Sequence, residues 1–386
     1  MRSFAKNLAL LMAGVIVALL LSELIVRIAA PQRVDTLRPI WQSDSNIVFR
    51  LKNNLAITYS QFEFEVAEST NSFGIRDREL SPKRTNEYRI LGLGDSYSYA
   101  NGVDLNDTYY KKLEKCLNQK EGNDVSVLNC AVPANTLLQE FGFLKKYGGQ
   151  LAPDAVLLGF YVGNDFTDSY DLYDEDGKPR VRVEDGYIVS SKLADKQTGL
   201  RGFLFPIRMF LATKSHLYVF TRNRMSEFLA HIGLRSAPPP PEFCAKEFSD
   251  RVQKGWELDQ RLLQEMSKFT RQHNLRLIVV VLPEIYQVHT EAWESYIRTF
   301  GIDSSLYDLD KPQRLVRTFC AENNIECLDV LSEMRSIAKT KQMIYPIDAH
   351  MNPEGHDLVA RLLCEYVGRT SKGKDMITKY GIRSSP

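Results

Sequence analysis

The stretch Tyr88-Arg-Ile-Leu-Gly-Leu-Gly-Asp-Ser96 decides the fold, because it predicts a buried strand that ends in a tight turn carrying a serine. Gly-Asp-Ser tripeptides occur often in loops by chance, so this one is informative only if other segments supply partners for Ser96. Whether Ser96 is functional therefore depends on residues elsewhere in the chain.

The segment Tyr345-Pro-Ile-Asp-Ala-His-Met-Asn-Pro-Glu-Gly-His356 supplies a base and a carboxylate to orient it. A serine hydroxyl becomes an effective nucleophile when an imidazole accepts its proton, and a carboxylate fixes the tautomer of that imidazole. Asp348 and His350 predict these two roles. Their separation of two residues favours a loop, because such residues would face opposite sides of a helix.

The same segment predicts that a helix begins directly after this loop. Asn352 is typical of an N-cap, Pro353 is typical of the first helical position, and apolar residues continue at helical spacing to Val367. His356 is a rival to His350 as the base. It falls inside this helix, so it is interpreted as packing or polar support.

Two further strand ends supply hydrogen-bond donors. Residues 157–165 form an apolar strand that runs into a Gly-Asn-Asp turn, where the side-chain amide of Asn164 can donate to the oxyanion that develops during acyl transfer. Residues 125–136 end another strand at a tight turn, and its backbone amides are a second source of donors.

Other chemistries fit these residues less well. Gly92 and Gly94 follow a strand as in a dinucleotide-binding loop, but Tyr97 occupies the position of the third glycine. Asp348 and the two nearby histidines lack a second cluster at metal-ligand spacing. The sequence has neither a phosphate-cradling loop nor a basic patch interleaved with aromatic residues. We therefore expect no cofactor, no metal and no nucleic-acid partner.

Taken together and in this order, the four segments resemble the SGNH (GDSL-type) hydrolase family over about residues 71 to 367. The resemblance implies a catalytic triad of Ser96, Asp348 and His350. It also implies an oxyanion hole formed by Ser96, Ala131 and Asn164.

The chain departs from the family pattern at two places. Ala131 stands where the family has a glycine, which keeps the backbone amide but admits fewer backbone conformations. The spacing Asp348-x-His350 is one residue shorter than the more frequent Asp-x-x-His, and this shorter spacing is similar to membrane-anchored members that O-acetylate exopolysaccharides.

The alternation of strands and helices predicts an α/β fold with a doubly wound, parallel five-stranded sheet, flavodoxin-like as in SGNH hydrolases. Strands are expected near 88–94, 125–130, 154–162, 275–282 and 325–329, and helices near 107–118, 136–147, 245–273, 311–323 and 352–367. The motifs then lie at the carboxyl ends of the strands, where open α/β sheets bind ligands.

The N-terminus predicts a membrane anchor. Arg2 and Lys6 precede an apolar run from Leu8 to Leu21 and on to Val26, which together approach the roughly 20 residues needed to cross a bilayer. A cleavage site after residue 30 would lack the required small residue, which favours an uncleaved signal anchor. The positive-inside rule leaves the N-terminus cytoplasmic and the catalytic domain in the periplasm or outside the cell.

Composition and spacing divide the rest of the chain. With 386 residues, 44% of them hydrophobic, and a net charge of +1, one large globular domain without a polyelectrolyte partner is expected. We expect the anchor over 1–30, an N-terminal extension packing on the core over 31–86, the SGNH-like domain over 87–370 and a disordered tail over 371–386.

An insertion at about 168–243 interrupts the hydrolase-like domain. It is predicted to contain a hairpin around Asp185-Gly186, a helical piece from 207 to 232 and a stiff boundary at Pro238 to Pro241. It is either a cover over the active site or a solvated decoration. The apolar piece from Phe203 to Tyr218 is interpreted as a core-packing helix rather than one lying on the membrane surface.

Six cysteines fit an oxidising compartment. Cys130 and Cys364 are interpreted as small core residues, and Cys320 with Cys327 is the most favoured bridge.

The function predicted from these features is a membrane-anchored serine esterase acting on acyl esters of carbohydrate or lipid in the cell envelope. One alternative is O-acetyl transfer to an exopolysaccharide, working with a membrane acyltransferase that supplies the acyl group. A second is a non-catalytic glycan-binding protein. The expected partners are the acyl-ester or glycan substrate and, through the N-terminal helix, the lipid bilayer.

Overall fold

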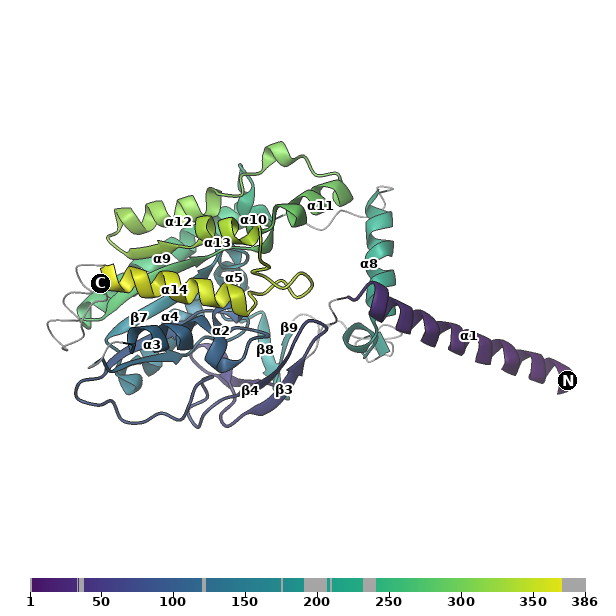
Figure 1. Ribbon diagram of the computed structural model, residues 1–386, viewed down its shortest axis with the longest axis horizontal. Helices are drawn as coiled ribbons and strands as arrows, with labels where there is room; N and C mark the ends of the chain where they lie inside the picture. Colours follow the sequence, from purple (N-terminus) through teal and green to yellow (C-terminus); the bar gives the residue numbers. More distant parts are fainter. Residues whose placement is uncertain are drawn as a thin grey trace.

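The computed structural model describes residues 2–32, 34, 38–119, 123–174, 176–190, 207–208, 210–231 and 241–369. Its main sheet contains five parallel strands in the spatial order β11-β10-β7-β5-β6 (Figure 1). The strands are β5 (Tyr88–Leu93), β6 (Val125–Asn129), β7 (Ala155–Tyr161), β10 (Arg276–Leu282) and β11 (Glu326–Asp329). Numbered along the chain this order is 2-1-3-4-5, the doubly wound arrangement of flavodoxin-like folds. The predicted fold class is confirmed, and each strand end lies within one residue of its predicted position.

Helices cover both faces of this sheet, so its central strands are buried on both sides. The longer helices are α3 (Tyr109–Leu117), α4 (Leu137–Leu151), α9 (Asp250–Gln272), α12 (Lys311–Glu322), α13 (Leu331–Ala338) and α14 (Pro353–Arg369). Successive strand residues point to opposite faces. Ile90 accordingly belongs to the buried cluster shared with α3, α13 and α14, and Leu91 to the cluster shared with α4, α9 and α12.

The N-terminal extension forms two antiparallel hairpins that the sequence did not reveal. They are β1 (Trp41–Asp44) with β2 (Val48–Leu51), and β3 (Ala56–Ser60) with β4 (Glu65–Ser69). Phe49 and Leu51 join one buried cluster of the core and Ile47 joins the other. The first of these hairpins is therefore part of the hydrophobic core of the domain.

Other helical elements connect these. They are α2 (Ser96–Tyr99), η1 (Leu105–Asp107), α5 (Asp165–Asp171), η2 (Glu242–Cys244), α10 (Ile285–Val288), α11 (Thr290–Phe300) and η3 (Ser304–Leu306).

Within the predicted insertion the hairpin is confirmed, with β8 (Val181–Glu184) paired to β9 (Tyr187–Ser190). Asp185 and Gly186 both have positive φ, at 51° and 91°, as a tight two-residue hairpin turn requires. The insertion also contains α8 (His216–His231). For the apolar piece from Phe203 to Tyr218, the interpretation of a core-packing helix is wrong at Ile207 and Phe210, which are 53% and 64% exposed. The first four residues of that piece, all but the last residue of the predicted boundary at Pro238 to Pro241, and the tail at 371–386 lie outside the described residues.

The N-terminal helix α1 (Arg2–Ala29) projects away from the sheet, with α8 beside its C-terminal end (Figure 1). The most apolar 18-residue stretch within Lys6–Ala29 has a mean hydropathy of 2.6, and only 6% of it is buried. By length and composition this helix could cross a membrane.

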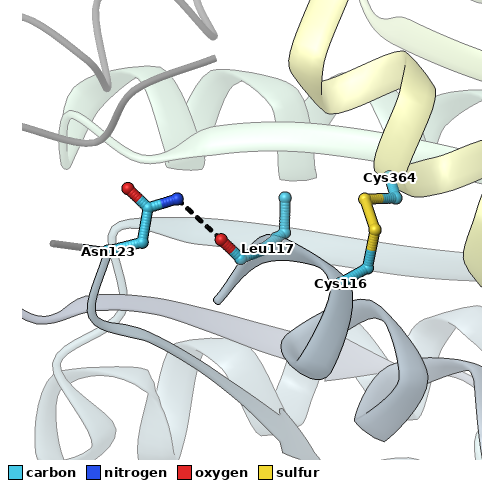
Figure 2. Close-up of a disulfide and its surroundings, with 4 residues drawn as sticks. All are labelled: Cys116, Leu117, Asn123 and Cys364. Carbon is cyan, nitrogen blue, oxygen red and sulfur yellow. Dashed lines mark hydrogen bonds between the residues drawn. A yellow bond between two sulfur atoms is a disulfide. The ribbon is translucent and has the colours of Figure 1, made fainter. Parts of the chain in front are cut away.

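A disulfide joins Cys116 of α3 to Cys364 of α14 across 248 residues of sequence (Figure 2). The interpretation of Cys364 as a free core residue is therefore wrong. The favoured bridge between Cys320 and Cys327 is also wrong, because these two thiols are free and hydrogen-bonded to each other. The sequence could not reveal the true pair, since only the folded sheet brings α3 and α14 side by side on one face.

Candidate active site

The turn after β5 presents Ser96 at the carboxyl end of the sheet. Gly94 has a φ of +151°, and a Cβ built there would lie 2.4 Å from the Cβ of Ser98, so only glycine fits. Asp95 then caps the short helix α2, its Oδ1 accepting the backbone N–H of Tyr97 at 2.9 Å. Ser96 is the first residue of α2, so its backbone N–H has no acceptor within that helix.

The structure brings the three predicted triad residues together. His350 Nε2 lies 2.9 Å from Ser96 Oγ, and His350 Nδ1 lies 2.5 Å from Asp348 Oδ1. A carboxylate can only accept, so Nδ1 carries the proton and Nε2 is left to accept the hydroxyl hydrogen of Ser96. Asp348 is 2% exposed and His350 is 9% exposed. The arrangement suits transfer of the serine proton to the imidazole.

The loop that carries Asp348 and His350 owes its shape to the residue between them. Ala349 has a φ of +67°, and the loop closes through hydrogen bonds from Tyr345 N–H to the His350 carbonyl and from Ala349 N–H to the Tyr345 carbonyl. This left-handed conformation costs a non-glycine residue about 1 kcal/mol. It draws the two flanking side chains closer than an extended chain would.

The N-terminal extension supports this loop from outside. In the turn between β3 and β4, Glu63 accepts the backbone N–H groups of Ile347 and Asp348 at 3.0 and 2.7 Å. The neighbouring Phe64 packs its ring 5.1 Å from that of Tyr345. No sequence motif marks Glu63, because its role depends on a contact with a loop 285 residues further along the chain.

Asn101 is a site residue that the sequence analysis missed. Its Nδ2 lies 3.4 Å from His350 Nε2, while its Oδ1 accepts from Arg38 Nη2 at 2.9 Å. Arg38 is itself paired with Glu68 at 2.7 Å inside the protein. Because the guanidinium can only donate, it fixes the orientation of the Asn101 amide and turns the N–H side toward the imidazole.

Two of the predicted oxyanion donors are engaged elsewhere. The Ala131 N–H donates to Oδ1 of the buried Asn129 at 3.2 Å, so in this conformation it already has an acceptor. Asn164 Nδ2 donates to Asp95 Oδ2 at 3.2 Å. This contact places Asn164 beside the turn that carries Ser96, with one of its two amide hydrogens committed to Asp95.

Buried carboxyl groups gather behind this turn. Burial raises the pKa of Asp95, Glu140 and Asp165. Burial also raises the pKa of Asp168 to about 7. The negative charge of Asp95 raises the pKa values of Glu140, Asp165 and Asp168 further. Among the described residues, no group of three His, Cys, Asp or Glu side chains is arranged to hold a metal ion.

His356 lies in the first turn of α14, where its contacts are with α3. Its Nδ1 accepts the backbone N–H of Tyr109 at 3.3 Å, and its ring stacks on that of Tyr109. Burial lowers the pKa of His356 to about 3, so it is neutral at physiological pH. These contacts agree with a role in packing and polar support.

No protein-family model matches the sequence, and no curated protein matches it. Solved structures align with this chain at low identity and with TM-scores below 0.5. A catalytic mutant of the acetylxylan esterase Axe2 from Geobacillus stearothermophilus aligns at 14% identity and TM-score 0.40, over 73% of this chain and 94% of that one. TesA aligns at 12% and 0.36, over 72% and 97%. A G-D-S-L family lipolytic protein from Veillonella parvula aligns at 11% and 0.36, over 73% and 100%. These likenesses are distant, so the chemistry of the site rests on its own atoms.

Proposed function

We propose that this chain is a serine esterase of the SGNH type, which transfers an acyl group from an ester to water through an acyl-Ser96 intermediate. The observation that supports it is the continuous hydrogen-bonded chain from Ser96 Oγ through His350 to Asp348. Proximity and orientation of this kind turn an unreactive hydroxyl into a nucleophile. The resemblance of the four sequence segments to SGNH hydrolases points to the same chemistry.

In the first half of the reaction, Ser96 Oγ attacks the ester carbonyl carbon as its proton passes to His350 Nε2. The tetrahedral intermediate collapses when the imidazolium returns that proton to the departing alkoxide. In the second half, a water molecule attacks the acyl-serine and gives its proton to Nε2, and the carboxylic acid leaves as Ser96 Oγ is reprotonated. Asp348 stays ionised and stabilises the imidazolium in both halves.

The oxyanion of the intermediate would be held by the Ser96 N–H and by the second amide hydrogen of Asn164. Ser96 follows β5, and Asn164, which follows β7, is hydrogen-bonded to the Ser96 turn through Asp95. Donors fixed before the reaction begins need no reorganisation in the transition state.

The domain is proposed to work outside the cytoplasm, with α1 as an uncleaved anchor whose N-terminus faces the cytoplasm. The disulfide between Cys116 and Cys364 supports this placement, since such bonds persist mainly in oxidising compartments. O-acetyl transfer to a glycan remains the alternative, because a sugar hydroxyl can replace water in the second half of the reaction. The Asp-x-His spacing favours that alternative. The assembled triad favours either reaction over glycan binding without catalysis.

The decisive experiment uses the full chain in detergent micelles or proteoliposomes. Release of acetate from a soluble acetyl ester and labelling by a fluorophosphonate are compared for the wild type, Ser96→Ala and the exposed control Ser60→Ala. We expect Ser96→Ala to lose at least about 10⁴-fold in rate and all labelling. Equal rates for the wild type and Ser96→Ala would refute the mechanism. Acetylation of an added purified glycan in preference to free acetate release would identify the transferase.

A further inference from the structure

Hydrogen bonds attach the start of α8 to α1 near its C-terminal end. Glu23 accepts the backbone N–H groups of His216 and Leu217 at 3.0 and 2.9 Å and the Ser215 hydroxyl at 2.7 Å. Arg27 binds Glu23 at 2.8 Å and donates to the Lys214 carbonyl at 2.7 Å. The anchor thus accepts two of the free N–H groups at the start of α8, in addition to the Ser215 hydroxyl, which accepts the Tyr218 N–H.

This attachment sets the height of α8 relative to a bilayer. Glu23 and Arg27 are the charged residues near the C-terminal end of the apolar span, so they belong at the level of the lipid headgroups when α1 crosses the membrane. Figure 1 shows α8 running across the end of α1 rather than continuing along it. A helix attached at that level and in that direction runs along the membrane surface.

The side chains on this segment suit a headgroup environment. Ile207, Phe210, Met225 and Phe228 are between 53% and 64% exposed. From residue 207 to 231 the sequence contains four Lys or Arg residues and one acidic residue, Glu227. Exposed apolar side chains beside a local excess of cations favour contact with the surface of an anionic bilayer.

We propose that residues 207–231, here called the membrane collar, lie in the headgroup region of the bilayer that holds α1. The four exposed apolar side chains enter the acyl-chain boundary, and Arg208, Lys214, Arg222 and Arg224 face anionic headgroups. The proposal rests on the anchoring part of the proposed function. Because the collar also contacts α11, it fixes the height of the hydrolase-like domain above the membrane.

The test measures the depth of labels in full-length protein reconstituted in vesicles made mainly of phosphatidylcholine with a minor fraction of phosphatidylglycerol. Cys327, the half-buried free thiol, is replaced by serine, and the other free thiols are buried. A single cysteine at Met225 or Phe228 carries an environment-sensitive fluorophore. The control label replaces Glu322, which is exposed on α12, the helix that Figure 1 places far from α1.

We expect quenching by aqueous iodide to be at least about threefold weaker at positions 225 and 228 than at 322, and quenching by doxyl-labelled lipid to occur only at 225 and 228. The variant Glu23→Gln, which weakens the attachment of α8 to α1, should bring iodide quenching at 228 closer to that at 322.

Iodide quenching at 225 and 228 equal to that at 322 would overturn the proposal. Protection that persists in detergent and increases with protein concentration would also overturn it, because a second copy would then cover the collar. Esterase activity measured in the same vesicles separates the two proposals. Active protein with water-exposed labels would refute only the membrane collar. Inactive protein with bilayer-embedded labels would refute only the proposed esterase activity.

Discussion

The carboxylate of Glu63 accepts the backbone N–H of Asp348 at 2.7 Å, so a hairpin turn 285 residues upstream holds the acidic member of the triad. It also accepts the N–H of Ile347, so two successive amides of the loop point at one side chain. The site is therefore built from both ends of the chain. The N-terminal extension, for which no sequence motif predicted a role, is part of the catalytic architecture in this interpretation.

Glu63→Ala should lower kcat/KM for a soluble ester by about tenfold to a hundredfold, because a loop displaced by about 1 Å carries His350 out of line with Ser96. Glu63→Gln, which keeps one acceptor oxygen, should recover part of the rate. The control is Glu65→Ala, an exposed residue on β4. A Glu63→Ala enzyme with wild-type kinetics would show that the loop holds its shape unaided.

Asn101 allows a prediction about pH dependence. Its amide donor faces Nε2, the atom that must stay unprotonated for catalysis. In Asn101→Asp a carboxylate replaces that donor, and a negative charge favours the protonated imidazole. The acidic limb of the pH–rate profile should therefore move to higher pH, by about one unit. Asn101→Ala should lower the rate with a smaller displacement of the limb. An unchanged profile in Asn101→Asp would place the side chain outside the reaction.

The sequence predicted the residues whose chemistry is written into local patterns. Ser96, Asp348 and His350 each lie beside a recognisable strand or helix end, and the structure brings them within hydrogen-bonding distance. The central strands β7 and β10 were predictable because nearly unbroken apolar runs identify strands buried on both faces.

What the sequence could not reveal depends on contacts between distant segments. Arg38 and Glu63 act through partners that only the folded chain brings near. The hydrogen bond from Ala131 to Asn129 depends on a side-chain rotamer, which the family resemblance does not determine. The pairing of Cys116 with Cys364 likewise depends on two helices sharing one face of the sheet.

The disulfide should stabilise the domain considerably, because it closes a loop of 248 residues in the unfolded chain. Removing a native disulfide typically costs about 2–5 kcal/mol, and we expect Cys364→Ser to fall in that range. The free energy of unfolding is measured by urea titration of the detergent-solubilised protein. Reductant should weaken the wild type to the level of the variant and leave the variant unchanged. Cys327→Ser is the control. If reductant destabilised Cys364→Ser as much as the wild type, a bond other than Cys116–Cys364 would be responsible.

The buried carboxyl groups behind Ser96 predict that the fold loses stability as the pH rises toward neutrality and above. Burial raises the pKa of Asp168 from 3.8 to about 7, so the folded state binds this proton more tightly than the unfolded state does. Its stabilising contribution is complete below pH 3.8 and is lost as the pH passes through about 7. Glu140 and Asp165, whose pKa values burial also raises, act in the same direction.

His356 has the opposite effect on stability, but only below pH 6.5. Its pKa falls from 6.5 to about 3 on folding, so between these values the unfolded state binds a proton that the folded state does not, and stability rises with pH. The informative window is therefore about pH 6.5 to 8.5, where Tm of the wild type should decrease. Asp168→Asn mimics the neutral carboxyl, so its Tm should decrease less over this window, whereas Asp185→Asn in the exposed β8–β9 turn should keep the wild-type slope. A wild-type Tm that rises across the window would mean that these carboxyl groups are ionised in the folded protein, with cationic partners compensating their charge.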